Sequence, residues 1–251
     1  MFAYDRRNEI RKLLKYEKSV AVEELAKKFF VSESTIRRDL DKLSGDGALR
    51  RTYGGAVMLE NSANDLPITI RERENTYEKN IIAQSAVKLI KDGATIIMDT
   101  SSTVTAMIQF LNTFENLTVI TNGIKTAYLL NSYGKITTYC TGGRLREHNM
   151  SLVGATTCQR LGEINADMAF ISCRGLSIEK GVTEASEEEA QVKKAMITAA
   201  AKTILLCDSS KFKMIMMNKV CEMNRLYAIV SDRRMPEEYV AYSEENNIIT
   251  I

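Results

Sequence analysis

The sequence is poor in the residues from which metal and disulfide sites are built. Its 251 residues include one histidine, His148, and five cysteines, none of which forms a Cys-x-x-Cys pair. An odd number of scattered cysteines indicates reduced thiols rather than a disulfide framework. A single histidine also makes a metal site hard to build, so we expect no metal.

Three further features are missing. No apolar run approaches the length of a membrane span, and the N-terminus is charged from Asp5 onward, unlike a signal peptide. The glycine fingerprints that bind dinucleotides or nucleoside triphosphates are absent as well. We therefore expect a cytoplasmic protein without a membrane segment or a nucleotide cofactor. Its length predicts one large or two unequal domains, and its 45% hydrophobic content is ample for packed cores.

The stretch from Val31 to Leu43 predicts an amphipathic helix with a polar outer face. Its apolar stripe consists of Ile36, Leu40 and Leu43, spaced as neighbours on one helix face. Ser32 is well placed to cap the first turn, and Arg38 lies nearly opposite the stripe with Arg37 at its shoulder. Hydroxyls followed by two arginines are what a recognition helix presents to DNA, although a solvated helix with ordinary surface arginines has the same pattern.

The flanking segments favour the DNA-binding interpretation. Residues 22–29 predict a second short helix, residues 30–32 leave only a tight turn, and the pair predicts a helix-turn-helix. Residues 49–58 predict two short strands around a Gly-Gly turn, which is a wing. The side chains expected to contact DNA are Ser32, Ser34, Thr35, Arg37 and Arg38 on the helix and Arg51 and Tyr53 on the wing.

The net charge of +2 is unevenly distributed along the chain. Residues 1–57 carry 13 basic and 9 acidic side chains, whereas the remainder carries 21 basic and 23 acidic ones. The basic excess therefore lies entirely in the segment that contains the predicted helix-turn-helix, as binding to nucleic acid requires.

Several motifs of this segment occur together in one known family. Val22-Glu23-Glu24-Leu25-Ala26, Thr35-Ile36-Arg37-Arg38-Asp39-Leu40 and Arg51-Thr52-Tyr53-Gly54-Gly55-Ala56 resemble the winged helix-turn-helix of the DeoR-type (deoxyribose-operon repressor) family. The resemblance spans most of residues 4–58. It implies a transcriptional regulator.

The rest of the chain alternates between two patterns. A polar stretch around Pro67 is the best linker candidate, and a long helix is expected from Ile70 or Arg71 to near Lys91. Apolar runs then occur at 94–98, 117–120, 136–140, 168–172 and 203–207, with helical patterns between several of them at 104–111, 124–130 and 186–200. A last pair of strands is expected at 225–230 and 247–251. Strands that alternate with helices predict a mostly parallel sheet covered on both faces.

Each apolar run is followed by polar or glycine residues. In such sheets ligands bind beyond the carboxyl ends of the strands. Hydroxyls and amides at residues 101–103 suit an anion, Gly142 and Gly143 allow close backbone approach, and Arg144 or Lys211 suits a phosphate. Asp99, Asn122 and Asp208 suit sugar hydroxyls. Structural explanations exist for each loop alone, since serines after strands are often helix caps and Gly-Gly pairs are often turns.

This second part also resembles the DeoR family, through Asp99–Val104, Val119–Asn122, Thr141–Leu145, Leu152–Gly154 and Asp208–Phe212. The family's sensor domain is similar in fold to ribose-phosphate isomerases, and its members commonly sense phosphorylated sugars. The resemblance therefore implies residues 1–58 as a winged helix-turn-helix domain, 59–70 as a linker and 71–251 as an α/β effector-sensing and oligomerisation domain. Cys173-Arg174-Gly175 replaces the turn that is more usual in the family. Arg174 therefore either influences which ligand is bound or is merely a local variant.

The candidate effector-binding residues are Asp99, Ser101, Ser102, Thr103, Thr121, Asn122, Gly142, Gly143, Arg144, Arg174, Asp208 and Lys211. Ser101 stands where the family often has glycine. The run from Ser186 to Glu189 matches a capping box, and we interpret it as structural.

The predicted function is a non-enzymatic regulator, most simply a repressor of a carbohydrate-utilisation operon that a phosphorylated sugar releases from double-stranded operator DNA. A homo-oligomer, dimer or tetramer, is expected because such modules normally read paired half-sites. An activator is not excluded. The alternatives are a sugar-phosphate isomerase with a DNA-binding appendage, and a small-molecule binding protein whose helix-turn-helix makes only protein contacts. The charge distribution and the wing disfavour the latter.

Overall fold

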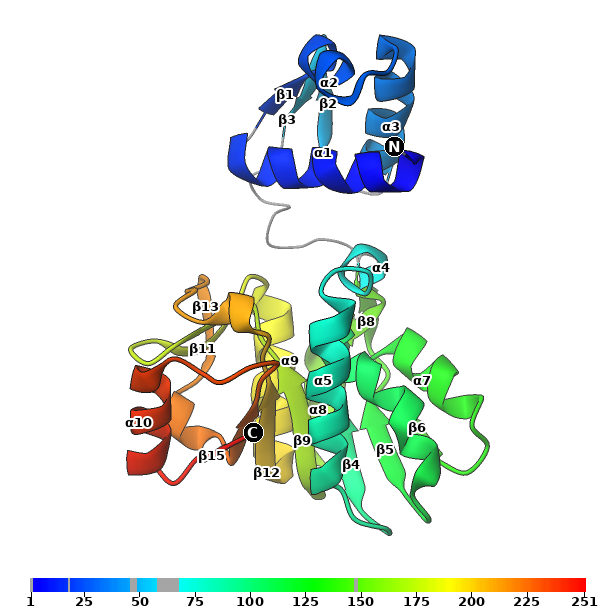
Figure 1. Cartoon of the computed structure of the whole chain (residues 1–251). Coiled ribbons are helices and arrows are strands. Elements are labelled where there is room, and N and C mark those ends of the chain that lie inside the picture. Colours follow the sequence, from blue (N-terminus) through cyan, green and yellow to red (C-terminus); the bar gives the residue numbers. More distant parts are fainter. Residues whose placement is uncertain (1, 18, 46–48, 58–67, 147–148) are drawn as a thin grey trace. The chain divides into compact units, whose positions relative to one another are not determined.

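The computed structural model describes residues 2–17, 19–45, 49–57, 68–146 and 149–251 (Figure 1). The chain forms two compact units, Met1–Ile70 and Arg71–Ile251. Most of the expected linker, residues 59–67, lies outside the described residues. No helix in the described ranges is both long and apolar enough to cross a membrane.

The N-terminal unit contains three helices and a small antiparallel sheet. Its elements are α1 (Ala3–Glu17), β1 (Ser19–Ala21), α2 (Val22–Phe29), α3 (Glu33–Gly45), β2 (Arg50–Thr52) and β3 (Gly55–Val57). The strand order is β1-β3-β2, and the register pairs Ala21 and Thr52 with Gly55. The turn of the β2–β3 hairpin is Tyr53-Gly54, one residue earlier than the predicted Gly-Gly turn. Glycine is required at the next position, because a Cβ on Gly55 would lie 2.2 Å from the Val20 carbonyl oxygen.

The expectation of one long helix from Ile70 or Arg71 to near Lys91 is wrong. The structure has α4 (Ile68–Arg71), a turn, α5 (Thr76–Ala86) and the 3-10 helix η1 (Val87–Leu89). The break coincides with a polar stretch that offers no continuous apolar stripe, and Asn75 takes the left-handed conformation there, with φ 51°.

The C-terminal unit is built on a seven-stranded sheet of order β15-β14-β12-β9-β4-β5-β6, in which every neighbouring pair is parallel. Its strands are β4 (Thr95–Met98), β5 (Thr118–Thr121), β6 (Thr137–Cys140), β9 (Ala166–Ser172), β12 (Ala200–Leu206), β14 (Ala228–Val230) and β15 (Ile249–Thr250). The predicted mostly parallel α/β fold is confirmed.

Helices cover both faces of this sheet (Figure 1). They are α6 (Ser102–Thr105), the 3-10 helix η2 (Ala106–Thr113), α7 (Ile124–Asn131), α8 (Ala155–Gly162), α9 (Glu187–Ala199), the short 3-10 helices η4 (Ser209–Lys211) and η5 (Met223–Arg225), and α10 (Glu237–Glu245). Alternate strand residues pack to opposite sides: Ile96 and Met98 join α5 and η2 in one core cluster, while Ile97 joins α8, α9 and α10 in the other.

The sequence patterns did not indicate two smaller antiparallel sheets. One has the order β10-β11-β13, from β10 (Gly175–Ser177), β11 (Gly181–Glu184) and β13 (Asn218–Cys221). The other pairs β7 (Arg144–Arg146) with β8 (Ser151–Val153). Several loops at the carboxyl edge of the main sheet therefore continue into short hairpins.

Candidate DNA-binding surface and effector site

The predicted recognition helix corresponds to α3. Ile36, Leu40 and Leu43 are fully buried, which confirms the apolar stripe. The Ser32 hydroxyl accepts from the Thr35 backbone N–H at 3.3 Å, which confirms the predicted N-cap. The turn before it bends at Phe30, which has the left-handed φ of 53° and donates its N–H to the end of α2. These contacts fix how α3 presents its outer face.

Four of the predicted DNA contacts lie on that outer face or at its edge. Ser34, Arg37 and Arg38 are exposed, and Thr35 is half-buried. Ser32 Oγ lies 2.9 Å from both Ser34 Oγ and Thr35 Oγ1, so the hydroxyls at the helix start form one cluster. Arg37 pairs with Glu33 one turn earlier at 2.9 Å. That pair is solvent-exposed and worth little, so it leaves Arg37 available to a phosphate.

The two wing residues differ in their surroundings. Tyr53 stands at the tip of the hairpin and is fully exposed. Arg51 instead points to the recognition helix, where its Nε lies 3.0 Å from an oxygen of Asp41. Arg51 therefore links the wing to α3, and a DNA phosphate would have to compete with Asp41 for it.

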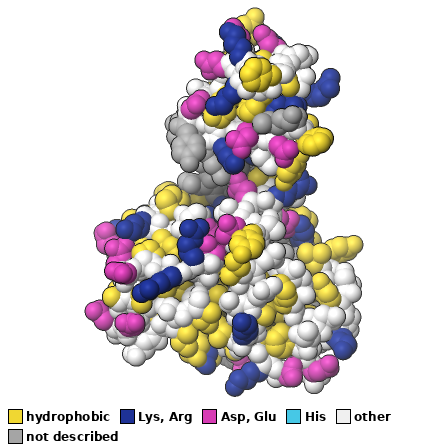
Figure 2. Space-filling model, viewed as in Figure 1, with side chains coloured by type: hydrophobic (Ala, Val, Ile, Leu, Met, Phe, Trp, Pro, Cys, Tyr) yellow, Lys and Arg dark blue, Asp and Glu magenta, His cyan; other side chains and the backbone are white. Residues whose placement is uncertain are grey.

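A buried ion pair in this unit was missed by the sequence patterns. Asp39, on the inner side of α3, accepts from Arg6 Nε at 2.6 Å and from Arg7 Nη1 at 3.3 Å, both on α1. Asp39 and Arg6 are 4% and 6% exposed. They are spaced along the chain like ordinary surface charges, so sequence alone gave no sign that they join two helices. The visible face of the unit mixes basic and acidic side chains (Figure 2).

In the C-terminal unit the predicted effector residues lie at the carboxyl ends of five neighbouring strands. From one side to the other these are β12, β9, β4, β5 and β6. The residues that follow these strands, in the same order, are Asp208 and Lys211; Arg174; Asp99, Ser101, Ser102 and Thr103; Asn122, after Thr121 at the end of β5; and Gly142, Gly143 and Arg144. Strand spacing of about 4.8 Å puts the first and last strands roughly 19 Å apart, so one small ligand cannot touch both ends.

Asp99 organises the centre of this edge. One carboxylate oxygen accepts from the Ser101 N–H at 2.8 Å and from the Ser101 hydroxyl at 2.6 Å; the other accepts from the Ser172 N–H at 2.9 Å. Ser101 in turn caps α6 by accepting from the Val104 N–H at 3.2 Å. The α-helix that follows is only four residues long before it becomes 3-10, so a helix dipole adds little here.

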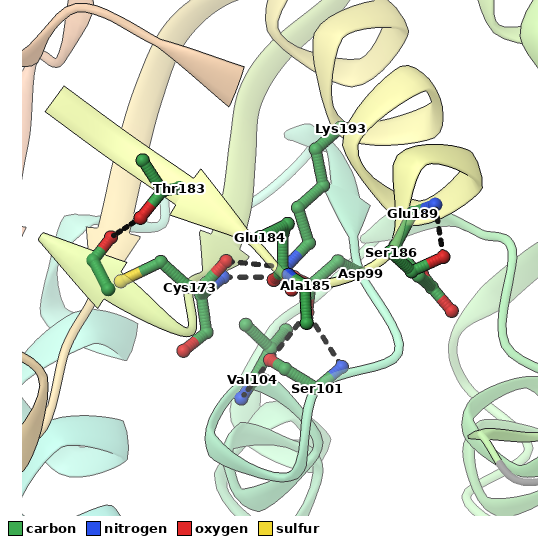
Figure 3. Close-up of polar contacts among 12 residues, drawn as sticks. Asp99, Ser101, Val104, Cys173, Thr183, Glu184, Ala185, Ser186, Glu189 and Lys193 are labelled. Atoms are coloured by element: carbon green, nitrogen blue, oxygen red, sulfur yellow. Dashed lines mark hydrogen bonds and ion pairs between the residues drawn. The ribbon is translucent and has the colours of Figure 1, made fainter. Parts of the chain in front are cut away.

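The second oxygen of Asp99 also faces a buried lysine that the sequence did not single out. Lys193, on α9, lies 3.3 Å from Asp99 and forms a close ion pair with Glu184 of β11 (Figure 3). It also donates to the Ser172 carbonyl oxygen at 2.6 Å. Burial opposes its charge, but Glu184 and Asp99 outweigh that effect and raise the pKa of Lys193 above its usual value. Its ammonium is therefore a fixed positive charge.

Glu189, one turn before Lys193, reaches the same region. Ser186 caps α9 through the Glu189 N–H at 3.5 Å, as the capping-box interpretation predicts. The Glu189 side chain, however, accepts from Ser151 Oγ at 2.6 Å and Asn149 Nδ2 at 3.2 Å. These are contacts within the protein, so they agree with the interpretation of this run as structural, and they place its buried side next to the candidate site.

The remaining predicted residues have distinct local roles. Thr121 accepts from the Gly123 N–H at 3.0 Å, and Asn122 donates to the Leu152 carbonyl oxygen at 3.0 Å. The other amide atom of Asn122, Oδ1, is buried without a hydrogen-bond partner in the described residues, and an orphaned acceptor of this kind suits a ligand hydroxyl. Gly143, with φ 124°, must be glycine, because a Cβ would lie 2.1 Å from Thr157 Oγ1.

The two cations proposed for a phosphate differ in availability. Arg144 is paired with Glu188 in the first turn of α9, and both side chains are exposed. Lys211 lies 3.8 Å from Asp208, a loose contact, and Lys79 of α5 lies close enough that Asp208 and Lys211 both influence its charge. Lys79 is 6% exposed and was not predicted as a site residue. Lys211 and Lys79 therefore lie beside β12, whereas Arg144 and Arg146 of β7 follow β6 in the chain.

Fold and surfaces together define a two-unit protein that joins a winged helix-turn-helix to an α/β ligand-sensing unit. Residues 6–62 match the sequence model of the DeoR-like helix-turn-helix domain, and residues 74–233 match that of the DeoR C-terminal sensor domain. The chain belongs to the DeoR family of transcriptional regulators. It is a DNA-binding transcriptional regulator.

Full-length relatives agree. The chain is 33% identical over 248 residues to an uncharacterized HTH-type transcriptional regulator, YulB, of Bacillus subtilis (strain 168), covering 99% of this chain and 96% of that protein. It is also 33% identical to the HTH-type transcriptional repressor GlcR of the same strain, covering 99% and 95%. A putative aga operon transcriptional repressor of Escherichia coli O157:H7 is 30% identical, covering 93% and 88%.

Solved structures with a similar fold include a ribose 5-phosphate isomerase A from Methanocaldococcus jannaschii. It has a TM-score of 0.42 and 22% identity, and the match covers 55% of each chain. The eIF2B delta subunit of Chaetomium thermophilum has a TM-score of 0.47 and 17% identity, covering 66% of this chain and 60% of that one.

Proposed function

We propose that this protein represses a carbohydrate-utilisation operon and is released from its operator by a phosphorylated sugar. The observation that carries the proposal is the arrangement at the carboxyl edge of the sheet. Lys211 and Lys79 supply positive charge beside β12, while Asn122 and Ser101 supply polar groups beside β5 and β4. A phosphate at one end and hydroxyls at the other match a sugar phosphate.

The spacing of the strands helps to decide which of the two candidate cations, Arg144 or Lys211, would bind the phosphate. Strands β12 and β4 are two strand intervals apart, about 10 Å, whereas β6, the strand that precedes the Arg144 loop, lies two intervals further on. Lys211, with Lys79 beside it, is therefore the favoured phosphate partner of the two cations that the sequence offered.

Relatives supply the biological context. The names of GlcR and of the putative aga operon repressor describe transcriptional repressors, and we extend that sign of regulation to this chain. Release would follow from linkage, since an effector that binds the DNA-incompetent arrangement more tightly shifts the population away from operator binding. Because operator DNA is the ligand, we place this action in the cytoplasm. Binding to paired half-sites requires at least a dimer. Light scattering on the purified protein would measure its oligomeric state.

On the DNA side, Arg38, Arg37, Ser34 and Thr35 would read the major groove, while Ser32 caps their helix and Arg51 and Tyr53 hold the backbone. Arg38→Ala is expected to weaken specific binding by about 5- to 150-fold, the loss typical of a base contact. Arg51→Ala is expected to lower the slope of log affinity against log salt concentration by about 1, which is the contribution of one phosphate contact. Arg160→Ala, which removes the same charge from α8 of the other unit, is the matched control.

The first experiment is fluorescence anisotropy on labelled DNA from upstream of the protein's own operon, at stated salt. It is run with and without hexose 6-phosphates, pentose 5-phosphates and inorganic phosphate. Sequence-specific binding that one sugar phosphate abolishes is the expected result. Binding that no compound changes would refute the sugar-phosphate effector, and a lack of preference over random DNA would refute the operator-binding role. Turnover of the same compounds would instead favour the isomerase alternative.

A further inference from the structure

The turn between α4 and α5 lies beside the candidate effector site. We call residues Arg71–Glu74 the strap: they begin the C-terminal unit and directly follow the segment that leads from the DNA-binding unit. Because α5 precedes β4 and runs back along the sheet, its first turn lies at the carboxyl edge of the strands (Figure 1). Three contacts with residues that the structure describes hold the strap there.

The first contact is the ammonium of Lys79. Its Nζ donates to the Arg71 carbonyl oxygen and, at 2.6 Å, to the Glu74 carbonyl oxygen. These are its only hydrogen-bond acceptors among the described residues, so one of the three protons of this buried group has no protein acceptor. Lys79 thus closes the turn from one side and retains one donor for another ligand.

The second contact leads into the site. Arg71 Nη2 donates to Asn149 Oδ1 at 2.7 Å, and Asn149 Nδ2 donates to Glu189 Oε1 at 3.2 Å. Glu189 also accepts from Ser151 at 2.6 Å, and Ser151 opens the strand β8 that pairs with Asn122 through the Leu152 N–H at 2.7 Å. A continuous chain of hydrogen bonds therefore joins the strap to the loop after β5.

The third contact is an ion pair between Glu72 and Lys125, near the start of α7. Lys125 follows Gly123 by two residues, so this contact also borders the loop after β5. The other oxygen of Glu72, Oε1, is buried without a partner in the described part of the chain. Leaving a buried carboxylate oxygen without a hydrogen bond costs free energy. The closed strap is therefore disfavoured relative to an arrangement in which Glu72 Oε1 has a partner.

We propose that the strap is the element through which the effector site controls DNA binding, and that an anionic effector beside Lys211 engages the Lys79 ammonium and loosens its hold on the strap carbonyls. This inference rests on the proposed function. A phosphate is a stronger partner for the ammonium than a neutral carbonyl oxygen, so a bound effector draws Lys79 Nζ away from the strap, and occupancy of the site and the closed strap disfavour each other. Because the strap is joined covalently to the segment that leads from the DNA-binding unit, it is the place at which a change in the effector site would reach that unit along the chain.

The charges around Lys79 support this coupling. Burial is the main cause that lowers the pKa of Lys79, to about 8, against a partial opposing effect of Asp208. A phosphate bound nearby would favour its charged form, so the group responds strongly to an anion.

The test uses three full-length variants and the wild type. Arg71→Gln weakens the strap without touching the proposed phosphate partner, and Lys79→Met removes the donor that holds the strap. Lys88→Met, which removes an equivalent charge from an exposed side chain of η1, is the control. Operator affinity is measured by anisotropy without ligand and with the sugar phosphate that weakens wild-type binding most. Affinity for that compound is measured separately by calorimetry.

In the wild type the compound is expected to weaken operator binding by about 5- to 150-fold, the usual range for coupled sites. In Arg71→Gln that ratio is expected to fall to about twofold or less, while affinity for the compound changes by less than about threefold. Lys79→Met is expected to lose compound affinity as well, and Lys88→Met is expected to match the wild type. Hydrogen exchange of residues 71–75 should also accelerate when the compound binds the wild type.

Two outcomes separate the inference from the proposed function. If the wild type responds to a sugar phosphate and Arg71→Gln responds equally, with unchanged exchange in residues 71–75, the strap is not the coupling element and only this inference fails. If the wild type neither selects its operator nor responds to any compound, the proposed function fails and the inference falls with it. Circular dichroism of Arg71→Gln guards against misfolding, and Arg71→Lys, which retains the charge, is expected to recover part of the response.

Discussion

Asp39 offers a direct test of how the recognition helix is held in place. It is 4% exposed and is bound by Arg6 at 2.6 Å and Arg7 at 3.3 Å, so it is the anion between two cations of α1. Replacing it with alanine leaves the buried Arg6 guanidinium without compensation, and breaking a buried pair in this way costs about 3–5 kcal/mol.

That cost is large for the unit concerned. A unit of about 70 residues has a free energy of unfolding of roughly 4–10 kcal/mol at the usual stability per residue. We therefore expect Asp39→Ala to unfold the N-terminal unit at a much lower temperature while the C-terminal unit melts as in the wild type. Operator binding should be lost in proportion to the unfolded fraction, and effector binding should be retained.

The assay is calorimetric unfolding of the full chain, in which the two units are followed as separate transitions. Asp41→Ala is the matched control: Asp41 is exposed and its partner Arg51 only half-buried, so it should cost about 1 kcal/mol, well below the cost of Asp39→Ala. The double variant Arg6→Leu with Asp39→Leu should recover much of the lost stability, because apolar replacements of similar volume avoid the buried charge. A wild-type melting profile for Asp39→Ala would refute the reasoning.

Three further predictions concern the C-terminal unit. In Gly143→Ala the new Cβ would lie 2.1 Å from Thr157 Oγ1, whereas in Gly142→Ala it would meet nothing within 4 Å. Urea unfolding should therefore show that Gly143→Ala destabilises the C-terminal unit by about 1–3 kcal/mol more than Gly142→Ala does. Equal losses of stability would contradict the clash. Lys79 has a pKa of about 8 in the folded chain and about 10.4 when unfolded, so the unfolded state binds more protons between these values. Stability relative to Lys79→Met should therefore rise by up to about 3 kcal/mol from pH 8 to 10.5, and a fall would refute the burial. Cys140 is the exposed cysteine, so Cys140→Ser should remove the fast phase of thiol modification at pH 8, and an unchanged fast phase would contradict this.

The sequence predicted those features that depend on regular periodicity. Ile36, Leu40 and Leu43 recur on one helix face, and each run such as Ile96–Met98 is apolar throughout because a central parallel strand is buried on both faces. The polar residues after each strand then fall at one edge by topology alone. Most of the candidate site could therefore be located without coordinates.

What the sequence could not predict are buried charges. Lys193 and Glu189 occur in a run that looks like a solvated helix face, and Lys79 occurs in a polar stretch that looks like a helix start. Their burial depends on partners far along the chain, such as Glu184 and Asp99 for Lys193. Periodicity reports which side of an element faces the core, but it does not report whether a charged residue finds an opposite charge there.

The same buried charges explain why this edge suits a sensor better than a catalyst. A general base must be free to take a proton from its substrate. Asp99 already accepts from Ser101 and Ser172 and faces Lys193, and Glu184 is paired with Lys193, so neither carboxylate is free without breaking the network (Figure 3). A sensor, in contrast, requires charges that stay in place when the ligand binds, next to a segment that can move. In the proposed mechanism Asp99, Glu184 and Lys193 are these fixed charges, and the strap held by Lys79 is the segment that moves when the ligand binds.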